Sequence, residues 1–250
     1  MRLVDLSLPI LNSEDAAPVL HPTDHRISAK ERGKSLGFDP GLLPEPGVHM
    51  ASEHFDLGTH RGGTHVDAPW HYGPTSEGRP ARTIDELPLA WFFSDGVKLD
   101  CTSLSADATI ELDLVQSELH RIGYVVKPLD IVLFHTGADQ HWGKAAYETS
   151  SPALSRQAVE WLLDRGVKVV GIDAFSPDRA VRASTGELVA GHPERFLPVH
   201  MLGREREFCI VEKLANLGAI PAHGFRVCLF PVKVQRGSGG WCRAVAVLSN

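Results

Sequence analysis

Three histidines and an aspartate lie close together in one short segment of the chain. His60, His65, Asp67 and His71 fall within twelve residues, interleaved with glycine and proline. Imidazole nitrogen and carboxylate oxygen are ligands that zinc-like divalent ions bind at about 2.0–2.2 Å. His65 and Asp67 are two positions apart, so they point to the same side of an extended segment, and Pro69 favours a turn that brings His71 back over them. This pattern predicts a metal site rather than unrelated core or surface histidines.

The elements that must position these residues alternate between strands and helices. A helix expected over 152–165, capped by Ser151, separates two short apolar segments at 130–134 and 167–172, which predicts a strand–helix–strand unit. Further elements are expected as a helix at 113–122 and as strands at 3–10, 208–211, 225–234 and 242–248. We therefore predict an α/β fold with more strand than helix, formed by a single domain over residues 1–250. Residues 13–50 are rich in proline, glycine and charge, which indicates an irregular excursion or flap.

The composition narrows the class of partner. The net charge of the 250 residues is -6, which argues against nucleic acid because phosphate binding needs clustered lysine and arginine. No stretch approaches the 18 or so apolar residues of a membrane-spanning helix, and the N-terminus shows no secretory signal. The four cysteines are scattered without a C-x-x-C pair, which favours reduced thiols over a disulfide framework. We expect a cytoplasmic protein that acts on a small molecule.

The segment around His65 resembles a known family. Residues 63–71, Gly-Thr-His-Val-Asp-Ala-Pro-Trp-His, are similar to the signature His-x-Gly-Thr-His-x-Asp-x-Pro-x-x-His of the cyclase/kynurenine formamidase superfamily, which includes arylformamidases and isatin hydrolases. The resemblance implies the swivelling β/β/α fold of that family. It also implies that His65 and Asp67 bind metal and that His71 acts as the acid and base. His200 and Glu212 have the twelve-residue spacing of two further family ligands.

One position departs from the family signature. The first metal histidine usually stands four residues before the histidine of Gly-Thr-His, and Arg61 occupies that position here. A guanidinium group is always protonated and cannot bind a cation. Residues 62–63 are both glycine where the family has one, so an inserted residue would move His60 into the ligand role. The alternative is that the ligand is lost and that His60 is a loop histidine. We expect His60 to be a ligand.

The resemblance implies a hydrolase in which one or two ions of Zn²⁺ or Mn²⁺ activate water to attack an aryl amide or cyclic amide. The reaction expected first is that of an arylformamidase in tryptophan catabolism, converting N-formylkynurenine to kynurenine and formate. Alternatives are opening of a lactam or lactone, as in isatin hydrolases, polyketide-type cyclisation, or a catalytically inactive metal-binding protein. Family members form homodimers or homotetramers. Three aromatic residues could stack on an aromatic substrate or equally be packing residues, namely Phe55, Trp70 and Tyr72.

Overall fold

The computed structural model of the chain describes residues 1–12 and 19–248 and contains two compact units. Met1–Pro9 and Thr59–Asn250 make up the first unit, and Ile10–Gly58 make up the second. The first unit contains every residue that the sequence predicts to bind metal. Its fold is therefore what positions the site.

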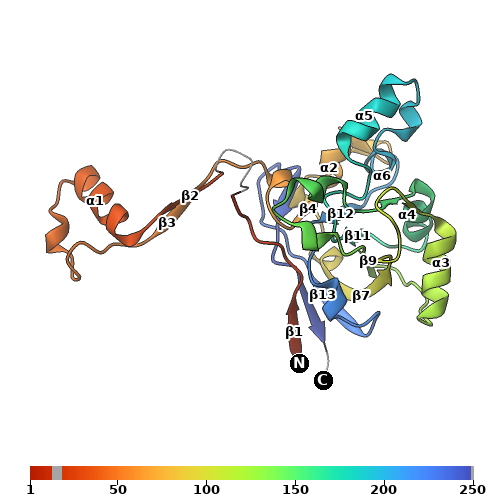
Figure 1. Cartoon of the computed structure of the whole chain (residues 1–250), viewed down its shortest axis with the longest axis horizontal. Helices are drawn as coiled ribbons and strands as arrows, with labels where there is room; N and C mark the ends of the chain where they lie inside the picture. Colours follow the sequence, from red (N-terminus) through yellow and green to blue (C-terminus); the bar gives the residue numbers. More distant parts are fainter. Residues whose placement is uncertain (13–18, 249–250) are drawn as a thin grey trace. The chain divides into compact units, whose positions relative to one another are not determined.

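A sheet of nine strands forms the centre of the first unit (Figure 1). In sheet order the strands are β1 (Arg2–Asp5), β15 (Val245–Leu248), β13 (Phe225–Cys228), β7 (Phe93–Asp100), β9 (Ile131–His135), β11 (Val169–Ile172), β12 (Cys209–Glu212), β4 (His65–Asp67) and β14 (Gly239–Trp241). The four strands from β7 to β12 run parallel, and the strands on both sides of them pair antiparallel. The fold is thus mixed α/β, as the sequence predicts.

Helices connect the parallel strands, because a parallel pair needs a crossover connection. Helix α3 (Leu112–Arg121) lies between β7 and β9 in the chain, and α4 (Arg156–Leu163) lies between β9 and β11. The sequence places α3 within one residue of its observed bounds. The predicted start of α4 is wrong, because residues 153–154 form a short strand, and Ser155 caps the helix by accepting the N–H of Ala158.

Shorter elements complete the first unit. The remaining helices are α2 (Pro69–Tyr72), α5 (Val181–Val189) and α6 (Pro198–Leu202). Three two-stranded pairs lie outside the large sheet in the described chain, and the strands of the two pairs in this unit are β5 (Thr75–Ser76), β6 (Arg79–Pro80), β8 (Thr109–Ile110) and β10 (Ala153–Leu154). The 3₁₀ turns are η2 (Thr59–Arg61), η3 (Ile84–Glu86), η4 (Leu89–Trp91), η5 (Ala138–His141), η6 (Ala145–Thr149), η7 (Pro193–Arg195) and η8 (Leu217–Ala219). The predicted strand at 225–234 ends early, at Cys228, and proline occupies position 231.

The strands bury side chains on both faces of the sheet. On β9, Val132 and Phe134 belong to one hydrophobic core, while Ile131 and Leu133 belong to the other. Apolar residues of α3 and α4 join the first core, so these helices cover that face. Val66 of β4 packs in the second core. Because side chains alternate along a strand, the residues on either side of Val66 point to the opposite face.

The second unit is a small hairpin with a helix inserted in it. Strands β2 (Leu20–Thr23) and β3 (Ser52–Phe55) pair antiparallel and are joined by α1 (His25–Leu36) and the turn η1 (Pro40–Leu42). The prediction of an irregular excursion at 13–50 is therefore wrong for this helix, and residues 13–18 lie outside the described residues. Hydrophobic periodicity does not reveal α1, because the residues it buries are small or polar, namely Ser28, Ala29 and Gly33.

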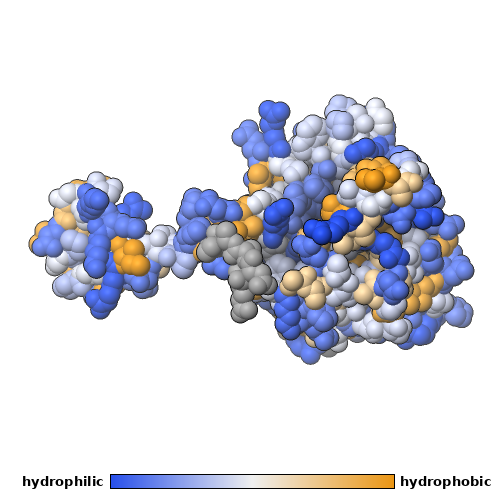
Figure 2. Space-filling model, turned by 45° about the horizontal axis from the view of Figure 1, so that its top comes forward, coloured by the Kyte–Doolittle hydropathy of each residue, from blue (hydrophilic) through white to orange (hydrophobic). Residues whose placement is uncertain are grey.

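Two expectations from the composition concern the cysteines and membrane-spanning helices. All four cysteines are free, and Cys101 and Cys209 are buried. Within residues 1–12 and 19–248, no helix combines the length and the apolar character needed to cross a bilayer. On the face of the molecule seen in Figure 2, strongly apolar residues are scattered among polar ones.

Candidate metal centre

Strand β4 brings two of the predicted residues together and pairs them with a third from the distant β12. His65 and Asp67 have no exposed surface, and both point away from the core that holds Val66. In the antiparallel pair, Glu212 stands directly opposite His65. Its Oε2 lies 3.5 Å from His65 Nε2, and His65 Nε2 lies 3.2 Å from Asp67 Oδ1. Sheet register therefore accounts for the meeting of residues that are far apart in the sequence.

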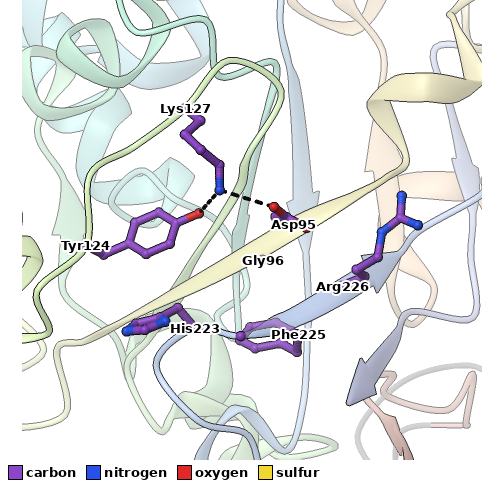
Figure 3. A pocket seen from close by; sticks show the side chains of 8 residues that line it. Asp95, Gly96, Tyr124, Lys127, His223, Phe225 and Arg226 are labelled. Atoms are coloured by element: carbon purple, nitrogen blue, oxygen red, sulfur yellow. Dashed lines mark hydrogen bonds and ion pairs between the residues drawn. The ribbon is translucent and has the colours of Figure 1, made fainter. Parts of the chain in front are cut away.

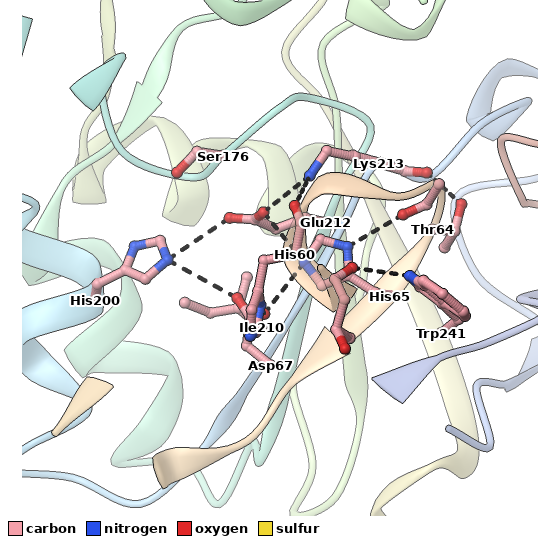
Figure 4. Close-up of polar contacts among 12 residues, drawn as sticks. His60, Thr64, His65, Asp67, Ser176, His200, Ile210, Glu212, Lys213 and Trp241 are labelled. Carbon is pink, nitrogen blue, oxygen red and sulfur yellow. Dashed lines mark hydrogen bonds and ion pairs between the residues drawn. The ribbon is translucent and has the colours of Figure 1, made fainter. Parts of the chain in front are cut away.

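His60 reaches the same cluster from η2. Its Nδ1 lies 2.7 Å from Asp67 Oδ1 (Figure 4), and its Nε2 lies 2.8 Å from the hydroxyl oxygen of Ser238. A Cβ at Gly239 would lie 2.9 Å from the His60 ring, so glycine is required there for the ring to fit. Arg61 is exposed to solvent. The chain thus turns His60 inward and Arg61 outward, which is the arrangement expected from an inserted residue.

His200 approaches the cluster from α6. Its Nε2 lies 3.8 Å from Asp67 Oδ2 and 3.7 Å from Glu212 Oε1. On the other side of the ring, Nδ1 lies 2.7 Å from Asp178 Oδ2. The Asp178 carboxylate also accepts the backbone N–H groups of Val199 and His200 at 2.9 and 3.0 Å. An N–H at Nδ1 that donates to Asp178 leaves Nε2 free to face the cluster.

Asp178 and Ser238 were not predicted from the sequence. Asp178 is buried in the loop before α5, and Ser238 immediately precedes β14. Neither has a ligand-type spacing to a histidine in the sequence. Their roles depend on contacts between segments that only the folded chain brings together.

His71 covers the cluster from the short helix α2. Its ring stacks on that of His60 with a centroid distance of 3.8 Å and an interplanar angle of 18°. The residue keeps exposed surface, whereas the three histidines predicted to bind metal are buried or partly buried. Neighbouring groups nevertheless bury much of the His71 ring. This desolvation and the neighbouring imidazoles outweigh the attraction of Asp67 and lower the pKa of His71 to about 4.

Electrostatic effects favour an ionised Asp67 and a protonated His200 when no cation is bound. Burial by itself would raise the pKa of Asp67, but the nearby His65 ring and the hydrogen bond from His60 hold it well below the usual value. Burial would likewise lower the pKa of His200. The hydrogen bond to Asp178 and the nearby carboxylates outweigh that effect and raise the pKa to about 9.

The residues present fit a divalent cation. Two groups of ligand atoms each lie within 4.8 Å of one another, one from His60, His65 and Asp67 and one from Asp67, His71 and His200. His65 Nε2 and Asp67 Oδ2 are buried and have no hydrogen-bond partner in the described part of the chain. Burying such atoms without a partner is costly. A set of imidazole nitrogens and carboxylate oxygens suits zinc or manganese, and a cation would give both atoms a partner.

The three aromatic residues near the motif have different surroundings. Tyr72 is buried, and its hydroxyl lies between the carbonyl of Asp67 and the N–H of Ile210, so it is a packing residue. Trp70 is 44% exposed beside His71 and remains a candidate for substrate contact. Phe55 is on β3 in the second unit, with 41% exposure.

A separate pocket of about 370 Å³ lies beside β7 and β13 (Figure 3). Its Lys127 donates to Asp95 Oδ2 at 3.1 Å and to the Tyr124 hydroxyl at 2.8 Å. None of the residues of the cluster lines it. Lys127, Asp95 and Tyr124 satisfy one another, and His223 and Arg226 contact backbone carbonyls, so these groups offer no free ligand atoms comparable to those of the cluster.

The mixed sheet and its cluster of histidines and carboxylates define an α/β protein with a candidate metal centre. The chain belongs to the putative cyclase family, whose model matches residues 4–179. It is 30% identical over 203 residues to the isatin hydrolase of Roseibium aggregatum, covering 77% of this chain and 73% of the relative. It is 24% identical over 213 residues to the kynurenine formamidase of Erythrobacter litoralis, covering 84% and 83%. These findings confirm the resemblance predicted from the sequence.

Solved structures of isatin hydrolases have a similar fold. The structure of an isatin hydrolase bound to the product analogue thioisatinate superposes with a TM-score of 0.74 at 22% identity, covering 99% of this chain and 92% of that one. The two relatives are hydrolases that act on amide carbon–nitrogen bonds, and the isatin hydrolase of known structure shares the architecture described above.

Proposed function

We propose that the protein is a metal-dependent hydrolase that cleaves an amide whose nitrogen is attached to an aromatic ring. The observation that carries the proposal is the convergence of two distant segments, 60–71 and 200–212, around His65 Nε2 and Asp67 Oδ2, buried atoms with no hydrogen-bond partner among the described residues. The named substrates of the two relatives, isatin and a formylated kynurenine, both contain such an amide.

In this proposal five residues hold the cation, which is Zn²⁺ or Mn²⁺, namely His60, His65, Asp67, His200 and Glu212. When bound, such an ion polarises a carbonyl oxygen and lowers the pKa of water. Asp67 stands at the centre of the set, because its two oxygens face His60 and His65 on one side and His200 on the other. Asp178 keeps the Nε2 atom of His200 directed at the cluster.

His71 serves as the acid and base. Its low pKa leaves the ring neutral near pH 7, so a ring nitrogen can accept a proton from water. The same nitrogen then returns the proton to the departing amide nitrogen. The carbonyl–nitrogen bond breaks, a carbon–oxygen bond forms, and the products are a carboxylate and an aromatic amine. The partly exposed position of His71 over the cluster gives it access to both groups.

The substrate is tested by assaying isatin and N-formylkynurenine side by side with protein loaded with Zn²⁺ or Mn²⁺. Opening of isatin to isatinate would assign the lactam reaction, and release of formate would assign the formamidase reaction. The greater identity to the isatin hydrolase favours the former. We expect the turnover to be abolished by a chelator and by Asp67→Asn, while Asp95→Asn, at an exposed carboxylate outside the cluster, leaves it intact. Absence of hydrolysis of both substrates by metal-loaded protein would contradict the proposal.

The proposal also includes a cytoplasmic location and a homodimer or homotetramer. The family resemblance supports the oligomer, and the scattered free thiols support a reducing compartment. Light scattering of the purified protein would test the oligomeric state, and fractionation of the cells that express it would test the location.

A further inference from the structure

Lys213 is a buried lysine at the edge of the candidate metal centre. It directly follows Glu212 at the end of β12, and 1% of its surface is exposed. Its Nζ donates to the carbonyl of His60 at 2.9 Å and lies 3.5 Å from Glu212 Oε2 (Figure 4). It also lies 4.6 Å from the centre of the Phe175 ring. A carbonyl, a carboxylate and an aromatic face are all groups that attract a cation. Lysine is almost never fully buried unless it is paired in this way.

The backbone at Lys213 is also unusual. Its φ is 60°, in the left-handed region that residues other than glycine, asparagine and aspartate rarely adopt. Lysine at this position therefore has a conformational cost as well as a burial cost. Some compensating interaction must hold the ammonium group in place, and the contacts with His60 and Glu212 are the ones observed.

The charges around the cluster show how the Lys213 contacts would affect metal binding. Among the described residues, the carboxylates within 4 Å of the cluster histidines are those of Asp67, Glu212 and Asp178. Histidines that hold a metal are neutral, so Lys213 is the remaining cation that contacts one of these carboxylates. Three carboxylates and one ammonium leave two negative charges, which one divalent ion balances. A second divalent ion would leave excess positive charge in a buried site, where charges interact strongly.

We propose that Lys213 acts as a fixed positive charge that limits the cluster to one divalent cation. This inference deepens the proposed function and rests on it, because it concerns the same metal centre. The ammonium group neutralises Glu212 and thereby removes the charge that a second ion would need beside His200. The contact with His60 keeps the ammonium group against the cluster, since that carbonyl belongs to the turn that carries the first ligand.

Metal stoichiometry tests this inference. Purified full-length protein is dialysed to equilibrium against Zn²⁺ or Mn²⁺ at a series of buffered free concentrations, and bound metal is counted by mass spectrometry. Lys213→Asn removes the charge, and asparagine tolerates the left-handed backbone, so the variant should fold. Lys213→Arg keeps the charge. Lys168→Gln is a matched control, because Lys168 is partly buried and likewise donates to a carbonyl, that of Glu207, outside the cluster.

We expect one ion per chain in the wild type, Lys213→Arg and Lys168→Gln. Lys213→Asn should bind two, the second at least about tenfold more tightly than the wild type binds it. A folded Lys213→Asn that still binds one ion would reduce Lys213 to an anchor of the His60 turn and overturn the inference. Two ions of similar affinity in the wild type would overturn it without any variant, and would leave the proposed hydrolase standing. No bound ion in the wild type would instead contradict the proposed function.

Discussion

Glu212 and His65 face each other across the antiparallel strands β12 and β4, with Glu212 Oε2 3.5 Å from His65 Nε2. The pair joins the two halves of the candidate metal centre through the hydrogen bonds of the sheet itself. Ligand positions held on strands vary less than positions held on loops. The cluster can therefore keep its shape whether or not a cation is bound, except at His60, which a 3₁₀ turn supports.

Asp178→Asn should weaken metal binding without removing a ligand. The carboxylate orients His200 and accepts two backbone N–H groups of α6, so an amide in its place would keep the shape but lose the charge-assisted hydrogen bond to Nδ1. Loss of such a supporting group typically costs about 10–100-fold in metal affinity or activity. Competition with a chelator measures the affinity. An affinity equal to that of the wild type would show that His200 does not depend on Asp178.

The motif residues could be predicted because their spacing is local. His65 and Asp67 share one strand, and helices α3 and α4 have an apolar face that the sequence displays. The contacts of His200 with Asp178 could not be predicted, because they depend on how the loop after β11 passes α6. Helix α1 was missed for a different reason. It buries only small or polar residues, so it has no apolar period to detect.

His71→Asn should abolish most of the turnover and leave the metal in place. His71 stacks on His60 at the exposed edge of the cluster, and the other five residues suffice for the cation. Removing a general acid and base typically lowers the rate by about 10²–10⁴-fold. Single-turnover kinetics and metal analysis of the same sample measure the two effects separately. A variant that turns over as fast as the wild type would exclude the acid–base role, and one that lost its metal would make His71 a ligand.

The thiols of Cys101 and Cys242 should be inert in the folded protein at pH 8. Burial raises the pKa of Cys101 to about 12, helped by nearby carboxylates, and burial likewise raises the pKa of Cys242 to about 12. Since the thiolate is the reactive form, both groups remain protonated and unreactive until the pH approaches that value. Labelling with a thiol reagent, followed by peptide mass spectrometry, should modify neither residue in native protein and all four cysteines in guanidinium chloride. Rapid native labelling of Cys101 would show that its core opens readily.

Whether His60 takes the ligand role that Arg61 cannot fill is tested by comparing two adjacent alanine variants. His60→Ala removes an imidazole whose Nδ1 lies 2.7 Å from Asp67, whereas Arg61→Ala truncates an exposed side chain. We expect His60→Ala to lose metal affinity by at least about tenfold and Arg61→Ala to retain it, because surface changes away from special features have small effects. Gly239→Ala offers an independent test. Its Cβ would lie 2.6 Å from the Val66 carbonyl and 2.9 Å from the His60 ring, so it should displace His60 and also weaken metal binding.

Gly186→Ala is the matched control for that second test. Gly186 lies inside α5, and a Cβ there has nothing within 4 Å, so alanine should stabilise the helix slightly, by about 0.5–1 kcal/mol. Unfolding in urea measures this effect, and metal titration should show no change. If Gly239→Ala and His60→Ala both bound metal as the wild type does, the cation would be held without His60. The turn that brings His60 inward would then have a purely structural role, and the chain would lack the ligand that the family signature usually places four residues before the histidine of Gly-Thr-His.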